Sequence, residues 1–350
     1  MTCKTAGLFA KAVSVVTPQQ LMHSDAKLYD MVIKDKLIIR DLDYAKKVFQ
    51  RISPFHLENF GLTWKTADGT YQDGTTFEML VDSYLTDRRI KNFLFDYLSD
   101  YEVQLRHVIG TVLLESFGAY GYLDSGHFRQ DDYHKNFIND LENELTRANE
   151  PFVRRFCPEE GKTRDVPVYV AMEVITLGTL TKIFKNMRRP EQKRVSAFYG
   201  VASEIVLYSF FSCLAKLRNT CAHHGRLSNR RFTDGCAVLK ADRRTMERVA
   251  PEFHPDPFRF FVMLLALMHV MDAQSNREII IHFRRTFALH PYFLPRFLDF
   301  PEQWETILCE AAGIDVDSLD QEDIRWEPIA SDRWVMPATE AEDLSDQYES

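Results

Sequence analysis

Residues 202–225 have the sequence ASEIVLYSFFSCLAKLRNTCAHHG. Apolar side chains recur through this stretch at the period of a helix with a buried face. They are Ile205, Val206, Tyr208, Phe211, Leu214 and Leu217. The pattern predicts a core helix from about Ala202 to Ala222. Gly225 is expected to end it, because glycine readily adopts the left-handed conformation that follows many last helical turns.

The same period continues outward from this helix. A long amphipathic helix is predicted over 90–112, and shorter ones near 136–146, 168–177, 179–187, 191–198, 257–271, 277–288 and 302–312. Thr17-Pro18 and Asp41 are start signals for two N-terminal helices, and Thr75 with Glu78 fits a capping box. Residues 60–76 contain two Asp-Gly pairs and predict a turn-rich connection or small hairpin. Strand-like alternation is rare, so an all-α fold is expected.

Composition limits the class of protein. The chain has 350 residues, 45% hydrophobic and 27% charged, with 14 Gly and 14 Pro. These values argue against a disordered chain and against a turn-rich all-β fold. No run of about 18 apolar residues lacks a charge, so no membrane span is expected. We predict three parts: an N-terminal helical region at 1–70, a helical core at 71–310 and an acidic tail at 311–350.

Charge is distributed unevenly along the chain. The net charge is −8, but residues 311–350 carry twelve acidic residues against two arginines, whereas residues 182–248 carry fifteen Lys/Arg against five acids. The basic segment either follows the phosphates of a nucleic acid or forms a solvated helical face. The acidic tail could shield it until a competing polyanion displaces the tail.

The densest cluster of reactive side chains lies where the core helix is predicted to end. Arg218, Asn219, His223 and His224 are candidate catalytic residues there. A guanidinium can bind a phosphodiester through two parallel hydrogen bonds. An imidazole can take a proton from a ribose 2′-OH or give one to the leaving 5′-oxygen. Arg218 and His223 are about 140° apart around a helix, so only a long side chain or local unwinding brings them together. Helix capping and the helix dipole are the structural alternative.

Other chemistries have weaker support. The chain has no P-loop, GxGxxG, HExxH or GxSxG motif, and its six cysteines lack CxxC spacing, which indicates reduced thiols and a cytosolic protein. Zinc bound by Cys221, His223 and His224 would need a fourth ligand, since adjacent helical histidines diverge. Cys221 as a nucleophile is less favoured than Cys221 as a buried thiol. No metal and no cofactor is therefore expected.

The sequence from Arg218 to Arg230 resembles the signature of the Abi-like proteins of bacterial abortive infection, which belong to the HEPN superfamily. The HEPN mark is an Arg with a His four to six residues further on, and both Arg218-x4-His223 and Arg218-x5-His224 fit it. Weaker matches in the same order are 37–52, Thr75–Glu78 with Tyr84, Asp87 and Arg88, Tyr101-Glu102-x3-Arg106, Pro167-x5-Glu173-x4-Gly178 and Phe300-Pro301-x2-Trp304.

The resemblance implies a HEPN-like helical bundle, with additional N-terminal helices and the acidic tail, and an antiviral defence protein that binds RNA. The RNA is expected to be a small structured non-coding RNA, and a metal-independent endoribonuclease site would pair two motifs in a homodimer. Phosphate contacts are expected from Arg226, Asn229, Arg230, Arg231, Lys182, Lys185, Arg188 and Arg189. Glu102 and Arg106 either pair along one helix or support Arg218. The alternatives are a non-catalytic RNA-binding module and a toxin-like protein silenced by a partner.

Overall fold

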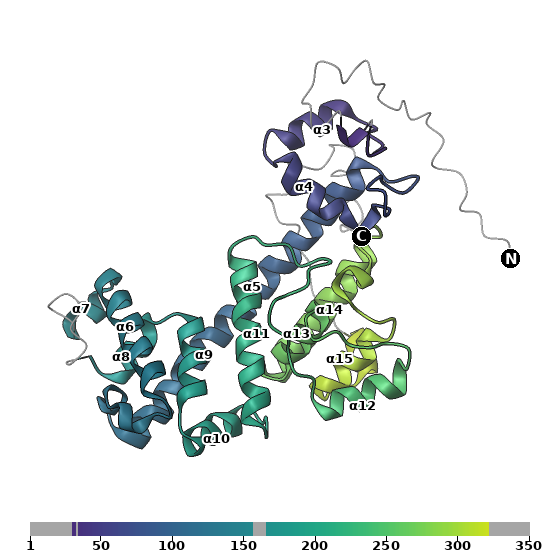
Figure 1. Cartoon of the computed structure of the whole chain (residues 1–350). Coiled ribbons are helices and arrows are strands. Elements are labelled where there is room, and N and C mark those ends of the chain that lie inside the picture. The colour runs from purple at the N-terminus through teal and green to yellow at the C-terminus, as the bar shows by residue number, and fades with distance from the viewer. Residues whose placement is uncertain (1–29, 33, 157–165, 322–350) are drawn as a thin grey trace. The chain divides into compact units, whose positions relative to one another are not determined.

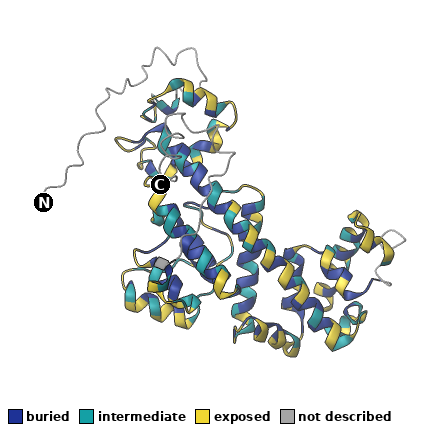
Figure 2. Cartoon of the chain, turned by 180° about the vertical axis from the view of Figure 1, so that it is seen from behind, coloured by how far each residue is buried: buried dark blue, intermediate teal, exposed yellow. Residues whose placement is uncertain are grey.

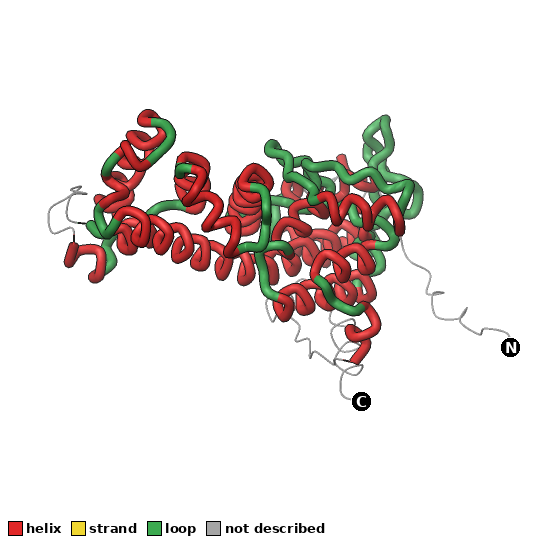
Figure 3. Tube along the Cα trace, turned by 90° about the horizontal axis from the view of Figure 1, so that it is seen from below, coloured by secondary structure: helices red, strands yellow, loops and turns green. Residues whose placement is uncertain are grey.

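The computed structural model of the chain describes residues 30–32, 34–156 and 166–321, and all regular structure in these ranges is helical (Figure 3). The all-α prediction is therefore confirmed for these residues. The helix predicted to begin at Thr17 and most of the predicted acidic tail lie outside the described residues. The described chain groups into two compact units, 30–88 with 290–293, and 89–289 with 294–321. The predicted three-part division stays a prediction.

The first unit contains α3 (Leu42–Phe49), α4 (Pro54–Gly61), η1 (Leu62–Trp64) and the first residues of α5 (Phe77–Phe117). Asp41 caps α3 as predicted, because its carboxylate accepts a hydrogen bond from the Tyr44 amide. The predicted capping box at Thr75 and Glu78 is wrong by one residue. The hydroxyl of Thr76 accepts from the Met79 amide, whereas Thr75 donates to the Gln72 carbonyl.

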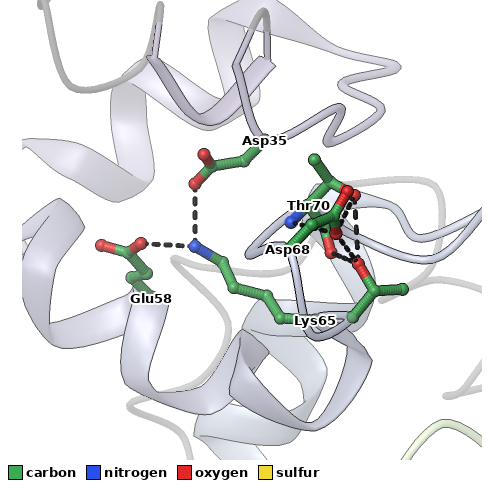
Figure 4. A network of polar contacts seen from close by, with 6 residues as sticks. Asp35, Glu58, Lys65, Asp68 and Thr70 are labelled. Carbon is green, nitrogen blue, oxygen red and sulfur yellow. Dashed lines mark hydrogen bonds and ion pairs between the residues drawn. The ribbon is translucent and has the colours of Figure 1, made fainter.

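A partly buried ammonium group connects three segments of this unit (Figure 4). Lys65 Nζ lies 2.8 Å from Asp35 Oδ2 and 2.8 Å from Glu58 Oε1. Burial lowers the pKa of Lys65, but its hydrogen bonds to the two carboxylates outweigh burial and raise the pKa above the usual value. Lys65 also pairs with Tyr71 in a single antiparallel bridge, so the predicted connection after residue 60 does turn back on itself like a small hairpin.

The second unit holds the rest of α5 and the remaining helices. They are η2 (Gly121–Leu123), η3 (Ser125–His127), α6 (Asp131–Arg147), α7 (Pro151–Phe156), α8 (Val168–Val174), α9 (Leu177–Asn186), α10 (Arg189–Phe198), α11 (Glu204–Ala222), α12 (Lys240–Val249), α13 (Phe260–Met268), α14 (Ala273–Leu289), η4 (Pro295–Leu298), α15 (Trp304–Ala312) and η5 (Val316–Gln321). In Figure 1, α11 lies between α9 and α13, and it packs against both.

Burial follows the predicted helical period. The stripe on α5 includes the buried residues Leu94, Leu98, Tyr101, Leu105, Ile109 and Val112, and all nine residues of α13 are buried. Elsewhere, buried and exposed positions alternate along the helices (Figure 2). Because α11 packs against both α9 and α13, its buried residues hold the helix in place. The polar residues of its last turn are therefore presented from a rigid element.

Candidate functional site

The candidate site lies at the C-terminal end of α11. Ser203 caps the start of the helix by accepting a hydrogen bond from the Val206 amide, and nine residues of α11 are buried. The last helical residue is Ala222. Arg218 and Asn219 therefore project from the final turn, as the sequence predicted, and His223 is the C-cap residue.

The left-handed residue that follows the C-cap of α11 is His224, and not Gly225 as predicted. His224 has φ 55°, in the left-handed region, whereas Gly225 does not. The Gly225 amide donates to the Thr220 carbonyl at 2.8 Å and the His224 amide to the Cys221 carbonyl at 3.2 Å, the two bonds of a Schellman motif. Glycine suits position 225 for another reason: a Cβ there would lie 2.9 Å from Arg230 Nη1, so the arginine side chain would have to move.

A buried lysine, which the sequence did not indicate, supports this helix end. Lys91 of α5 is 3% exposed, and its Nζ donates to the His224 carbonyl at 3.5 Å. The sequence offers one signal of this contact, a lysine inside an apolar stripe. A lysine that is buried there needs a hydrogen-bond partner. The contact places a cation at the negative end of the α11 dipole.

Arg218 is held by a buried carboxylate. Its Nε lies 2.8 Å from Glu102 Oε2, in an ion pair whose N–H is not aligned for a hydrogen bond. Glu102 is 7% exposed, while 30% of the Arg218 side chain is accessible. Arg218 Nη1 also lies 3.3 Å from Asn219 Oδ1. One edge of the guanidinium therefore faces the protein, and the side chain as a whole remains in contact with solvent.

The same carboxylate also binds Arg106. Arg106 Nη2 donates to Glu102 Oε1 at 2.6 Å, and Nη1 donates to the carbonyls of Met172 and Glu173 at 2.7 and 2.8 Å. These contacts join the end of α8 to α5 and, through Glu102, to α11. The two roles considered for Glu102 and Arg106 thus coexist in the geometry, because the i,i+4 pair is also the support of Arg218.

The two imidazoles lie on the surface at the same helix end. His223 and His224 are exposed, and neither side chain makes a hydrogen bond or ion pair with the described part of the chain. Neither ring makes a hydrogen bond or ring contact with the Arg218 guanidinium. The structure therefore brings Arg218, Asn219, His223 and His224 to one end of α11 without joining arginine to histidine.

Two buried side chains, one on α5 and one on α11, have pKa values well above their ordinary values and stay protonated near neutral pH. Burial raises the pKa of Tyr101, the neighbour of Glu102, well above its ordinary value. Burial likewise raises the pKa of Cys213, whose sulfur lies 2.7 Å from that of Cys236. Cys221 is buried too, which does not suit a nucleophile.

The loop after α11 carries the next set of predicted contacts. Arg230 lies over the Phe232 ring, and Arg231 lies over Phe258 and pairs with Asp256. Asn229 has φ 52°, and its amide donates to a carbonyl from η4 at 2.6 Å. Arg226 is partly exposed next to this segment. The loop is thus held in place, and the charge of Arg231 is partly neutralised.

The other predicted phosphate contacts lie toward the opposite end of α11. Lys182 and Lys185 are exposed on α9, and Lys185 lies over the rings of Tyr133 and Tyr208. Arg188 donates to the Gly126 carbonyl. Arg189 Nε lies 3.7 Å from the Glu204 carboxylate at the start of α11, which is about 21 Å along the helix from Arg218. The structure does not bring this group to the Arg218 cluster.

The described residues hold neither a metal-binding cluster nor a membrane-spanning helix. Among the described residues there is no group of three or more His, Cys, Asp or Glu side chains that could hold a metal ion. No helix in the same ranges is long and apolar enough to cross a membrane.

Comparison with known proteins gives one match. A family model described as Abi-like protein matches residues 47–229. No curated protein and no solved structure matches the chain. The matched residues include Glu102, Arg106 and the whole Arg218–Asn229 segment, and they end before Arg230, α12 and the Phe300–Trp304 segment.

Proposed function

Because the match covers more than half of the chain, the protein belongs to the Abi-like family, and we propose that it is a bacterial abortive-infection defence protein that acts on RNA in the cytoplasm. Its proposed activity is that of a metal-independent endoribonuclease of the HEPN type. The RNA partner is a small structured non-coding RNA. The proposed site consists of Arg218, Asn219, His223 and His224.

The observation that carries this proposal is the way in which Arg218 is held. Glu102 binds one edge of its guanidinium and is itself fixed by Arg106, so the cation has a defined position at an exposed helix end. A fixed, partly exposed guanidinium can bind a phosphodiester and stabilise the charge that develops on it during cleavage. Asn219, 3.3 Å from Arg218, orients the same group.

Two imidazoles complete the chemistry. One accepts the proton of the ribose 2′-OH as the 2′-oxygen attacks phosphorus. The other, protonated, gives a proton to the 5′-oxygen as the P–O5′ bond breaks. The products are a 2′,3′-cyclic phosphate and a 5′-hydroxyl, and the reaction needs no metal. His223 and His224 supply these groups.

A homodimer is part of the proposal. Within one chain the guanidinium of Arg218 makes no hydrogen bond or ring contact with either imidazole. Pairing two copies, so that the Arg–His motif of one chain faces that of the other, supplies the missing partner. The proposal of the HEPN superfamily rests on the Arg218-x4-His223 and Arg218-x5-His224 spacing.

The second candidate function is a non-catalytic RNA-binding module. It is favoured by the ion pair between Arg218 and Glu102, which uses part of the arginine's binding capacity, and because Arg218 makes no hydrogen bond or ring contact with either histidine. In this case the cluster recognises RNA and leaves it intact.

One experiment separates the two functions. Wild type, Arg218→Ala, Arg218→Lys and His223→Ala are incubated in EDTA with labelled RNA and with the 2′-deoxy analogue. Cleavage of RNA alone, lost in Arg218→Ala and His223→Ala, supports the nuclease, and Arg218→Lys should recover little activity because lysine lacks the planar fork. RNA that is bound but intact supports the module. Lys135→Ala, an exposed change on α6 whose side chain is 73% accessible, is the control.

A further inference from the structure

The helix α12 presents a cationic face that the Abi-like match does not reach. The helix spans Lys240–Val249, beyond the matched residues 47–229. Asp242 and Met246 form its buried side. Its exposed side carries Lys240, Arg243, Arg244, Glu247 and Arg248, four cations and one acid.

Three of these cations are unpaired in the part of the chain that the structure describes. The side chains of Lys240, Arg243 and Arg244 make no hydrogen bond or ion pair there, whereas Arg248 is paired with Glu310 of α15. Lys240 and Arg244 lie one turn apart, about 6 Å along the helix, and Arg243 lies beside them. Repulsion between like charges at this spacing disfavours the helix slightly, and an anion would remove that repulsion.

The helix is nevertheless fixed to the core. Asp242, 4% exposed, lies 2.8 Å from His269 Nε2, and the His269 ring stacks on Phe210 of α11. At the other end, Glu310 accepts hydrogen bonds from Thr245 and Arg248. The exposed cations are therefore presented from a rigid element, as a binding surface requires.

The link through His269 also relates α12 to the candidate site. Phe210 and Arg218 belong to the same helix, eight residues apart, which corresponds to about 12 Å along its axis. The anchored loop with Arg230 and Arg231 runs between the end of α11 and the start of α12.

We propose that the exposed face of α12 binds the phosphates of the RNA whose scissile bond lies at Arg218. The inference rests on the proposed function and adds a second contact surface to it. RNA is the occupant because the face offers unpaired positive charge and little apolar surface, which matches a polyphosphate backbone. The preferred substrate is then an RNA long enough to reach from the end of α11 to α12.

The test uses the full chain and single-stranded RNAs of increasing length in a binding titration by fluorescence anisotropy. The variant K240Q/R243Q/R244Q removes the three unpaired charges. The control K34Q/K135Q/R147Q removes three exposed charges elsewhere, with side chains 68%, 73% and 75% accessible. A third variant, K240R/R243K/R244K, keeps the charge on α12.

We expect the first variant to bind long RNA about tenfold or more weakly, with a log–log salt slope smaller by about two, because each neutralised phosphate contact on a single strand contributes about 0.7 to the slope. Short RNA should bind it as it binds wild type. The control and the charge-preserving variant should resemble wild type at every length. Thermal melting checks that all variants fold, and a loss of folding in the first variant moves the comparison to R243Q and R244Q singly.

Three outcomes overturn the proposal. If wild type binds no RNA of any length, the proposed function fails and this inference fails with it. If wild type binds and the α12 variant binds equally at all lengths, only this inference fails. If RNA binding is unchanged but residues 322–350 become more sensitive to protease in the α12 variant, the face holds that acidic segment and not RNA.

Discussion

The change Glu102→Gln tests whether a single buried carboxylate supports the site. Glutamine has nearly the same shape as glutamate, so the variant creates no cavity, and its effect is electrostatic. It leaves Arg106 and Arg218 without their shared anion. Arg106 keeps its hydrogen bonds to two backbone carbonyls, whereas Arg218 keeps only its contact with Asn219.

The magnitude follows from burial. Removing one partner of a buried ion pair costs about 3–5 kcal/mol, whereas an exposed pair contributes about 0–1 kcal/mol. The side chains of Glu102 and Arg106 are 9% and 13% accessible, which places their pair near the first case, and Arg218 at 30% lies between the two. We expect Glu102→Gln to lower the free energy of unfolding by about 2–4 kcal/mol, Arg106→Gln by about 2 kcal/mol, and Arg218→Gln by about 1 kcal/mol or less.

Urea unfolding of the three variants and of wild type at pH 7 measures this order, and RNA cleavage in EDTA is measured on the same samples. Arg218→Gln should be the most stable of the three variants and the least active, because its arginine serves the ligand more than the fold. Glu102→Gln should be weakly active under conditions in which it is fully folded. If Arg218→Gln destabilises the protein as much as Glu102→Gln does, Arg218 is a structural residue and the reasoning is refuted.

The other predictions concern single local features. His224→Gly should raise the free energy of unfolding by up to about 1 kcal/mol, because glycine adopts φ 55° without strain, and a drop in chemical denaturation would contradict the assignment of this residue as the helix end. Hydrogen bonds from Arg248 and Thr245 lower the pKa of Glu310 below its ordinary value of 4.5. Because this pKa is lower in the folded state, ionised Glu310 stabilises the fold above the unfolded-state pKa, and that stabilisation is lost as pH falls. Glu310→Gln should therefore cost less than about 1 kcal/mol at pH 7 and nothing once wild-type Glu310 is protonated. Urea unfolding at pH 7 and at acidic pH measures the difference. Asp41→Ala removes the cap of α3 and should cost about 1 kcal/mol in the first unit, with no change in RNA cleavage.

The sequence predicted the long helices from their apolar stripes and missed the shorter helices α4, α7 and α12. The period over 90–112 marked the buried side of α5, because each of those side chains is removed from water at the same angle. Helix α12 was not predicted, since only Asp242 and Met246 face the core and the rest of the helix is charged. The capping box was placed one residue early because Thr75 and Thr76 are both good caps, and only the path of the chain before α5 decides between them.

The sequence predicted which residues gather at the end of α11, but not the contacts that hold them there. The proximity of Arg218, Asn219 and the two histidines follows from their places in one helix end, which local sequence specifies. The support from Glu102 spans more than one hundred residues, and no local pattern distinguishes a carboxylate that pairs with Arg106 alone from one that also reaches Arg218. The role of Lys91 depends in the same way on where α5 passes the end of α11.

The conformation of His224 links the fold to the proposed chemistry. A left-handed residue costs a side chain other than glycine about 1 kcal/mol, and glycine is present one position later, at 225. A helix shifted by one residue would place that glycine at the left-handed position, but glycine also suits position 225, where a Cβ would lie 2.9 Å from Arg230 Nη1 and 3.1 Å from the Thr220 methyl group. Both positions therefore favour glycine, and His224 occupies the left-handed one. Such strain persists where surrounding contacts compensate for it, and the hydrogen bond from Lys91 to the His224 carbonyl is one of them. The supported backbone therefore fixes the point from which the exposed His224 side chain leaves the helix end.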